Sequence, residues 1–399
     1  MISFEQHLRN SAVSRELLNT FLDPSSGAWA KFDPELGYTV GNSLPRNGMD
    51  GCLTISTTQE NGARTARMYT DLPCRINTYG DSFTECHQVS DGETWQEYLA
   101  AHLGEPIRNF GVGGYGVYQA YRRMVRTESS GDGAANVLLY VWGDDHLRSL
   151  MRCRHAAIYP WWDHQGGLFF HNNFWSHLEM DLSTARFVDR PNLLPDARAL
   201  YRMCDPDFMY RSLRDDLMLQ LCLLEHVDPS SIDPAPLYSL ADCLGVTVPR
   251  GERSRVSTET AELIGRAYGF AATRHIIDRA SAFCRAHGKK LLLLLQCPTA
   301  TGQVLRGEPR YDREIVDFIR ERRIRFFDMN EVHGRDYRSF NLSTDDYMKR
   351  YHIGHYNPRG NHLFAYALKD LLVDVLEPKP LTYRGDARRP ADCSDYLPK

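Results

Sequence analysis

The chain has 399 residues, of which 42% are apolar and 25% are charged, a composition typical of a soluble globular protein and not of a disordered one. Its formal net charge of -4 gives no electrostatic reason to expect nucleic acid or an anionic membrane surface as a partner. The N-terminus has no basic segment followed by an apolar core, and no run reaches the roughly 18 apolar residues of a membrane span. We therefore expect a cytoplasmic protein that acts on a small molecule.

Residues 1–74 are predicted to form an extension of the main domain. Apolar residues recur at roughly helical spacing between positions 5 and 22, and an Asp-Pro-Ser-Ser-Gly sequence ends them, which predicts one docking helix. Residues 33–72 are rich in Gly, Thr, Asn and Ser. They predict irregular strands and turns that pack on the edge of the main domain.

Short apolar segments alternate with helical patterns over residues 75–146 and 258–376. The predicted strands are 76–79, 107–110, 137–142, 290–296 and 324–327, and the predicted helices are 93–104, 119–126, 261–287, 312–323 and 361–376. Parallel strands bury both faces, and right-handed crossovers place helices over them. The alternation therefore predicts a three-layer α/β/α domain with a flavodoxin-like parallel sheet, followed by a tail at 377–399.

A segment at residues 147–257, after the third predicted strand, is far longer than the two to six residues usual for such a connection. Helices are predicted at 197–203 and 208–227, and aromatic residues are dense between 159 and 177. These rings can be interpreted as a lid that lines a substrate pocket, because they bury large areas and several keep a polar edge. They can equally be the small core of the insertion, and the sequence leaves both interpretations open.

The cysteines and histidines do not indicate a metal centre. The ten cysteines include no Cys-x-x-Cys pair, which favours reduced thiols. The spacing of the insertion's histidines matches no metal-binding motif; these residues are His146, His155, His164, His171 and His177. We predict neither a metal nor a cofactor.

One stretch indicates nucleophilic chemistry. An apolar run closes on Gly80-Asp81-Ser82 and a helix-forming segment follows, which predicts that Ser82 lies at the carboxyl edge of the sheet, where open α/β folds bind ligands. A serine hydroxyl needs a base within hydrogen-bond reach. His355, in a loop just before the last predicted helix, is the candidate base.

Four motifs occur in a fixed order: Gly80-Asp81-Ser82, residues 109–116, residues 143–146 and His355 to Gly360. In this order they resemble the SGNH/GDSL hydrolase family, over roughly residues 33–145 and 258–376. The resemblance implies that Ser82 is the nucleophile and His355 the base. It also implies an oxyanion hole formed by the backbone amides of Ser82 and of Gly113 or Gly111, with a side chain from the third motif.

Two positions depart from that family's pattern. The asparagine of the third motif is replaced by Asp144, or by Asp145 if the register is shifted by one residue. A carboxyl group can donate to an oxyanion only when it is protonated, and otherwise it would bind a hydroxyl or ammonium group of the substrate.

The acid three residues before His355 is replaced by His352, which has no negative charge to offer the base. A backbone carbonyl, Asp345 or Asp346 remain as alternatives for orienting His355.

We therefore expect a serine-dependent hydrolase that cleaves an O-acyl ester of a small molecule, a sugar or a secondary metabolite through an acyl-serine intermediate. Two alternatives remain. One is an acyltransferase of the same fold, in which an acceptor replaces water. The other is a non-catalytic protein that binds a ligand in the same pocket.

Overall fold

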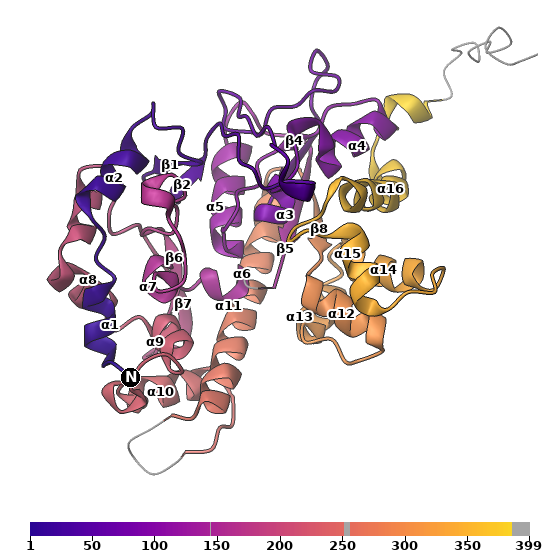
Figure 1. Cartoon of the computed structure of the whole chain (residues 1–399). Coiled ribbons are helices and arrows are strands. Elements are labelled where there is room, and N and C mark those ends of the chain that lie inside the picture. Colours follow the sequence, from indigo (N-terminus) through magenta and orange to yellow (C-terminus); the bar gives the residue numbers. More distant parts are fainter. Residues whose placement is uncertain (144, 251–255, 385–399) are drawn as a thin grey trace, which may run out of the picture.

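The computed structural model describes residues 1–143, 145–250 and 256–384, and a five-stranded parallel sheet lies at its centre (Figure 1). The strands are β3 (Ile76–Tyr79), β4 (Arg108–Asn109), β5 (Asn136–Val141), β8 (Lys290–Leu295) and β9 (Phe326–Asp328). Their order in the sheet is β4-β3-β5-β8-β9, which is the 2-1-3-4-5 order of flavodoxin-like folds. The predicted fold class is confirmed.

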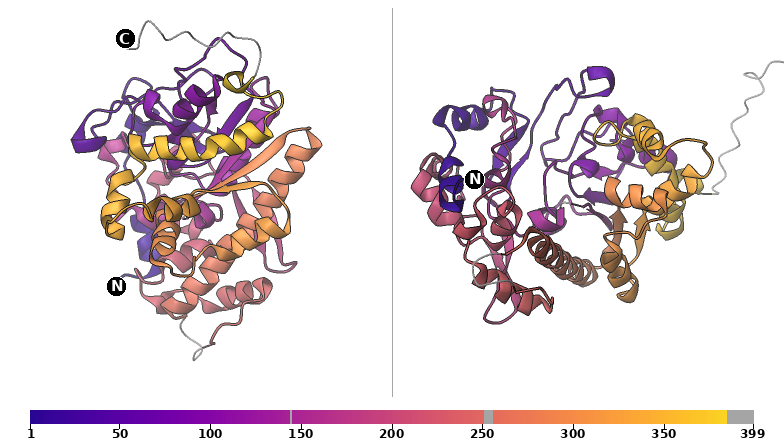
Figure 2. Two further views of the ribbon diagram at one scale, coloured as in Figure 1. Left: turned by 90° about the vertical axis from the view of Figure 1, so that its right-hand side faces the viewer. Right: turned by 60° about the horizontal axis from the view of Figure 1, so that its bottom comes forward.

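Helices cover both faces of the sheet. The first face packs against α4 (Trp95–Leu103), α14 (Met329–Tyr337), α15 (Thr344–Tyr351) and α16 (Pro358–Val375), and Figure 2 (left) looks onto this layer. The second face packs against α5 (Val117–Glu128), α11 (Thr258–Ala286) and α13 (Arg313–Glu321). Side chains of β5 alternate between the two cores, with Leu138 in the first and Leu139 in the second, as the two-residue period of a strand requires.

Three predicted helices differ from the structure. The expected single helix over 5–22 is two helices, α1 (Phe4–Asn10) and α2 (Arg15–Leu22), because the Ser14 side chain accepts from the backbone N–H of Leu17 and starts a new helix. The expected helix over 208–227 is likewise divided into α8 (Pro206–Leu213) and α9 (Leu217–Leu223). Here Asp216 is the cap that starts the second helix. The segment expected at 197–203 is a 3-10 helix, Ala199–Cys204.

The N-terminal extension and the insertion, which were predicted as separate units, form one body beside the sheet (Figure 1). His7 donates through Nε2 to the carbonyl of Ala156 at 2.8 Å, and His155 donates through Nε2 to the carbonyl of Ser11 at 2.8 Å. The other elements of this body are β1 (Ala30–Asp33), β2 (Gly37–Val40), α6 (Asp145–Arg148), α7 (His155–Ile158), β6 (His177–Asp181), β7 (Arg186–Arg190) and α10 (Pro234–Leu244). Their buried side chains share one hydrophobic core with the second face of the sheet.

The aromatic residues of the insertion divide between core and surface. Phe170, Phe174 and Trp175 are buried in the shared core, whereas Trp161 and Trp162 are 57% and 38% exposed. Core packing therefore accounts for part of the aromatic density.

None of the helices in the described parts of the chain is long and apolar enough to cross a membrane.

Candidate active site

Ser82 lies where the chain turns from β3 into a short helix, α3 (Ser82–Glu85). Asp81 caps this helix by accepting the backbone N–H of Phe83 at 2.9 Å. A Cβ added to Gly80 would lie 2.1 Å from Oγ1 of Thr84, so the turn requires glycine. The turn lies at the carboxyl end of β3 beside β5, the switch point of this strand order.

The structure brings Ser82 and His355 together. Nε2 of His355 lies 2.8 Å from the hydroxyl oxygen of Ser82. His355 comes from the loop between α15 and α16, and Asn357, which caps α16 by accepting from Gly360 at 2.9 Å, ends that loop. Two segments separated by more than half the chain thus meet at one pair of atoms.

Gln88 orients the imidazole. Its amide oxygen lies 2.9 Å from the backbone N–H of His355 and 2.9 Å from Nδ1 of the same residue. A backbone N–H can only donate, so the atom that faces it must be the amide oxygen. That oxygen can accept only if Nδ1 carries the hydrogen. Nε2 is then unprotonated and accepts the hydroxyl of Ser82, which is the arrangement that a general base needs.

His352 does not contact the ring nitrogens of His355, so it does not orient that ring. Nδ1 of His352 donates to the carbonyl of Met348 at 3.1 Å, and its ring packs against Tyr356 with centroids 4.6 Å apart. Both ring nitrogens of His355 are engaged by Gln88 and Ser82. Asp346, one of the carboxylates considered from the sequence, accepts from Ser343 at an exposed helix start. The group that orients His355 is instead the neutral amide of Gln88.

The surroundings of His355 disfavour its cationic form. Burial is the largest cause that lowers the pKa of His355 well below its usual 6.5, and the neighbouring His87, His352 and Arg148 lower it further. Among the described residues, none of the groups that shift the pKa of His355 is a carboxylate that would raise it. His355 is therefore a neutral base at neutral pH.

The two glycines predicted for the oxyanion hole donate their N–H groups to acceptors within the fold. The N–H of Gly113 donates to the buried carboxylate of Glu85 at 2.6 Å, and the N–H of Gly111 donates to the side chain of Asn109 at 2.9 Å. A Cβ on Gly111 would lie 2.2 Å from the backbone nitrogen of Glu85. The absence of side chains at these two glycines lets the loop after β4 pack closely against α3.

Asp145 is buried at the start of α6 and accepts Nη1 of Arg148 at 3.1 Å. Asp144 lies outside the described residues. The guanidinium of Arg148 lies 5.8 Å from the ring centroid of Trp142. Its charge lowers the pKa values of both His355 and Asp81, although burial dominates for Asp81 and raises that pKa to about 6. A buried cation thus lies close to the Ser82 turn.

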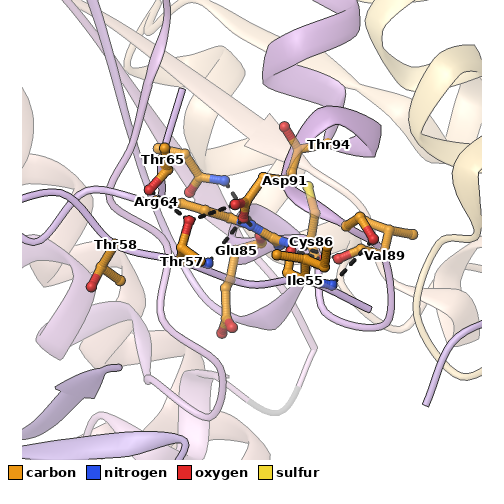
Figure 3. Close-up of polar contacts among 12 residues, drawn as sticks. Ile55, Thr57, Thr58, Arg64, Thr65, Glu85, Cys86, Val89, Asp91 and Thr94 are labelled. Atoms are coloured by element: carbon orange, nitrogen blue, oxygen red, sulfur yellow. Dashed lines mark hydrogen bonds and ion pairs between the residues drawn. The ribbon is translucent and has the colours of Figure 1, made fainter. Parts of the chain in front are cut away.

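Arg64 binds the backbone of the loop between α3 and Asp91, in which Gln88 lies, and Figure 3 shows it beside Cys86, Val89 and Asp91. Its guanidinium donates to the carbonyl of Cys86 at 2.8 Å and to that of Val89 at 2.6 Å, on either side of Gln88. Nε donates to Asp91 at 3.0 Å in a pair whose side chains are almost fully buried. Because the planar fork fixes several acceptors at once, Arg64 sets the position of the residue that orients His355.

The N-terminal extension also reaches the site. The indole of Trp29 stacks on the ring of His87 with centroids 5.4 Å apart, and His87 lies 5.2 Å from His355 by the same measure. The indole N–H of Trp29 donates to Glu85 at 3.3 Å.

Sequence reasoning missed Gln88, Arg64, Glu85 and Arg148. None of them belongs to a motif, and only the nearness of Gln88 and Glu85 to Ser82 in the chain could have drawn attention to them.

Within residues 1–143, 145–250 and 256–384, no group of three or more His, Cys, Asp or Glu side chains could hold a metal ion. No protein-family model matches the chain, and no curated protein matches it.

Proposed function

We propose that the protein is a serine-dependent acyl-ester hydrolase of the SGNH/GDSL type. The observation that supports this most is the 2.8 Å contact between Ser82 and Nε2 of His355, with Nδ1 held by Gln88. His355 takes the proton of the Ser82 hydroxyl as the oxygen attacks the ester carbonyl. It then returns the proton to the leaving alcohol, and water cleaves the acyl-serine by the reverse proton transfers.

Charge stabilisation in this proposal comes from Arg148 and the backbone amide of Ser82. The oxyanion develops beside Ser82, where the buried guanidinium acts electrostatically on both His355 and Asp81. Arg148 is held in place by its ion pair with Asp145, so its N–H dipoles are preorganised and can stabilise a developing anion with little reorganisation. This compensates for the glycine amides, which donate to Glu85 and Asn109.

The engaged glycine amides favour one alternative, a protein that binds a ligand without turnover. An acyltransferase would use the same acyl-serine. Hydrolysis of p-nitrophenyl acetate by the wild type, Ser82→Ala and Ser130→Ala separates turnover from binding alone. Ser130→Ala is the control, because it removes a serine hydroxyl from an exposed turn.

We expect turnover by the wild type and Ser130→Ala and none by Ser82→Ala, with equal melting temperatures. Equal turnover by all three proteins, or none by the wild type, would reject the hydrolase. Faster release of p-nitrophenol in the presence of an added alcohol, with transfer of the acetyl group to it, would identify a transferase.

A further inference from the structure

A largely apolar cavity of about 470 Å³ lies at the carboxyl ends of β5 and β8. This volume is within the range of small-molecule sites. Its walls come from the end of β5, from α9 and α11, and from residues after β8, and they include Trp142, Gly143, Leu221, Gly265, Phe270 and Tyr311. Leu221 and Phe270 are buried side chains, whereas the charged Glu225, Glu262 and Arg266 are exposed at the rim. An apolar interior with a charged rim suits an alkyl or aromatic group.

Trp142 lines this cavity and also contacts the residue that follows Ser82. It follows β5, the strand that pairs with β3. Its ring stacks on that of Phe83, the residue after Ser82, with centroids 5.5 Å apart. The guanidinium of Arg148 also lies 5.8 Å from the centroid of this ring. The cavity and the turn that carries Ser82 therefore both contact the same indole, beside the switch point of the sheet.

The two faces of the sheet indicate which half of an ester enters the cavity. His355 precedes α16 on the first face, and Phe83 and Tyr356 belong to the core of that face. Leu221 and Phe270 belong to the core of the second face. In acyl transfer the base protonates the leaving oxygen, so the alcohol half lies toward His355 and the acyl half lies away from it.

We propose that this cavity is the acyl-binding site and that the substrates are esters of medium-length alkyl or aromatic acids. This inference rests on the proposed function, because it assigns the acyl half of the ester that Ser82 attacks. The insertion supplies the α9 wall, which gives the long connection after β5 a direct role in substrate selection.

Gly265 offers a way to fill the cavity without disturbing its walls. It lies within α11, and the nearest atom to an added Cβ is Cβ of Leu221 at 4.0 Å. Alanine and leucine are both better helix formers than glycine, so neither substitution weakens the helix. Gly265→Ala is the matched control for the backbone change, and Gly265→Leu adds the bulk.

The first test compares kcat/KM for p-nitrophenyl acetate, butyrate, hexanoate and octanoate. Burial of one methylene is worth about 0.8 kcal/mol, which is about fourfold per methylene. We expect kcat/KM to rise with chain length in the wild type and, less steeply, in Gly265→Ala, and to stay nearly flat from acetate to octanoate in Gly265→Leu. A wild type without chain-length dependence, or equal slopes in all three proteins, would overturn the proposal. The acyl assignment would also be overturned if kcat/KM rose with the length of the alcohol chain in a series of alkyl acetates and Gly265→Leu removed that rise.

The second test needs no turnover. Calorimetric titration of the Ser82→Ala protein with octanoate should give binding that the additional Gly265→Leu substitution abolishes. If octanoate binds in this way but no ester is hydrolysed by the wild type, the hydrolase fails and the apolar site stands. If acetate esters are hydrolysed but octanoate does not bind, the acyl site fails and the hydrolase stands.

Discussion

The amide oxygen of Gln88 lies 2.9 Å from Nδ1 of His355, at the place where a catalytic triad holds a carboxylate. The amide fixes the same tautomer as a carboxylate does. It gives no negative charge to stabilise the imidazolium, and burial, followed by the neighbouring His87, His352 and Arg148, lowers the pKa of His355 well below 6.5. The residue that orients His355 is thus a neutral amide six positions after Ser82.

Replacing Gln88 by methionine should lower kcat/KM by about 100-fold to 10,000-fold, since loss of tautomer control in a triad costs up to about 10⁴. Methionine keeps the length of the side chain but cannot accept strongly from the backbone N–H and Nδ1 of His355. The measurement is kcat/KM for an activated ester at pH 7. A fully active Gln88→Met protein would mean that Gln88 is not the orienting residue.

Gln88→Glu should move the acid limb of activity toward higher pH. In the wild type the lowered pKa of His355 keeps the base neutral, so kcat/KM should stay level from neutral pH to well below pH 6.5. A carboxylate at position 88 favours imidazolium and raises that pKa. The pH profiles of the two proteins between pH 4 and 8 test this. Coincident acid limbs would contradict it.

Arg148→Met should reduce kcat/KM by about 10² to 10³, the range for loss of one oxyanion-stabilising group. The same change should raise the pKa of His355, because the Arg148 charge is one of the causes that lower it. Arg148→Lys is the control that keeps the charge. If Arg148→Met and Arg148→Lys share both the rate and the acid limb of the wild type, the charge has no catalytic role.

Arg64→Met should lower both stability and kcat. It leaves the buried Asp91 without its Nε partner and frees the carbonyls on either side of Gln88. Removing one member of a buried pair costs about 3 to 5 kcal/mol of unfolding free energy when the other charge is left unpaired. Arg67 still pairs with Asp91, so we expect a smaller loss here. Urea unfolding gives the stability, and kcat is measured where the variant is folded. A folded variant with unchanged kcat and pH profile would limit Arg64 to a structural role.

The protein should lose stability between pH 6.5 and pH 4. Burial lowers the pKa values of His155, His171 and His333 to about 3 and that of His352 to about 4. In this window the unfolded chain binds protons that the folded chain does not, so the unfolding free energy falls as pH falls.

Asp81 opposes this trend, because its raised pKa of about 6 lets the folded chain take up one proton in the same window. Burial also raises the pKa values of Glu97, Asp216 and Asp328. It lowers those of six further histidines, so lowered histidines outnumber raised carboxyl groups; the six are His7, His87, His102, His164, His275 and His355. Melting temperatures at pH 7.0, 6.0, 5.0 and 4.5 measure the effect, and a constant melting temperature would contradict the buried neutral state of the histidines.

The sheet was predictable because its signals are local. Runs such as the leucines of β8 are buried on both faces, and turn signals separate them from amphipathic helices. The sequence did not predict α12 (Pro298–Arg306) or α15, because both helices are short and have too few apolar residues to give a clear helical period. The break between α1 and α2 depends on one serine cap inside an otherwise continuous pattern.

The candidate site was only half predictable. Ser82 and His355 belong to motifs, and both lie beside helix starts that the sequence marks. Gln88 reaches His355 only because Cys86 and Gln88 adopt positive φ values of 63° and 69° and Arg64 holds the loop between them. Such a backbone path depends on contacts from a distant segment, so residue type and spacing do not reveal it.

The most direct measurement of the central claim is covalent labelling by a fluorophosphonate, followed by mass spectrometry of the labelled peptide. Because His355 is oriented to take the Ser82 proton, the wild type should carry one adduct per chain on Ser82. Ser82→Ala should carry none, and Gln88→Met should be labelled more slowly. A folded wild type that stays unlabelled, or whose adduct lies on another residue, would contradict the Ser82 and His355 mechanism.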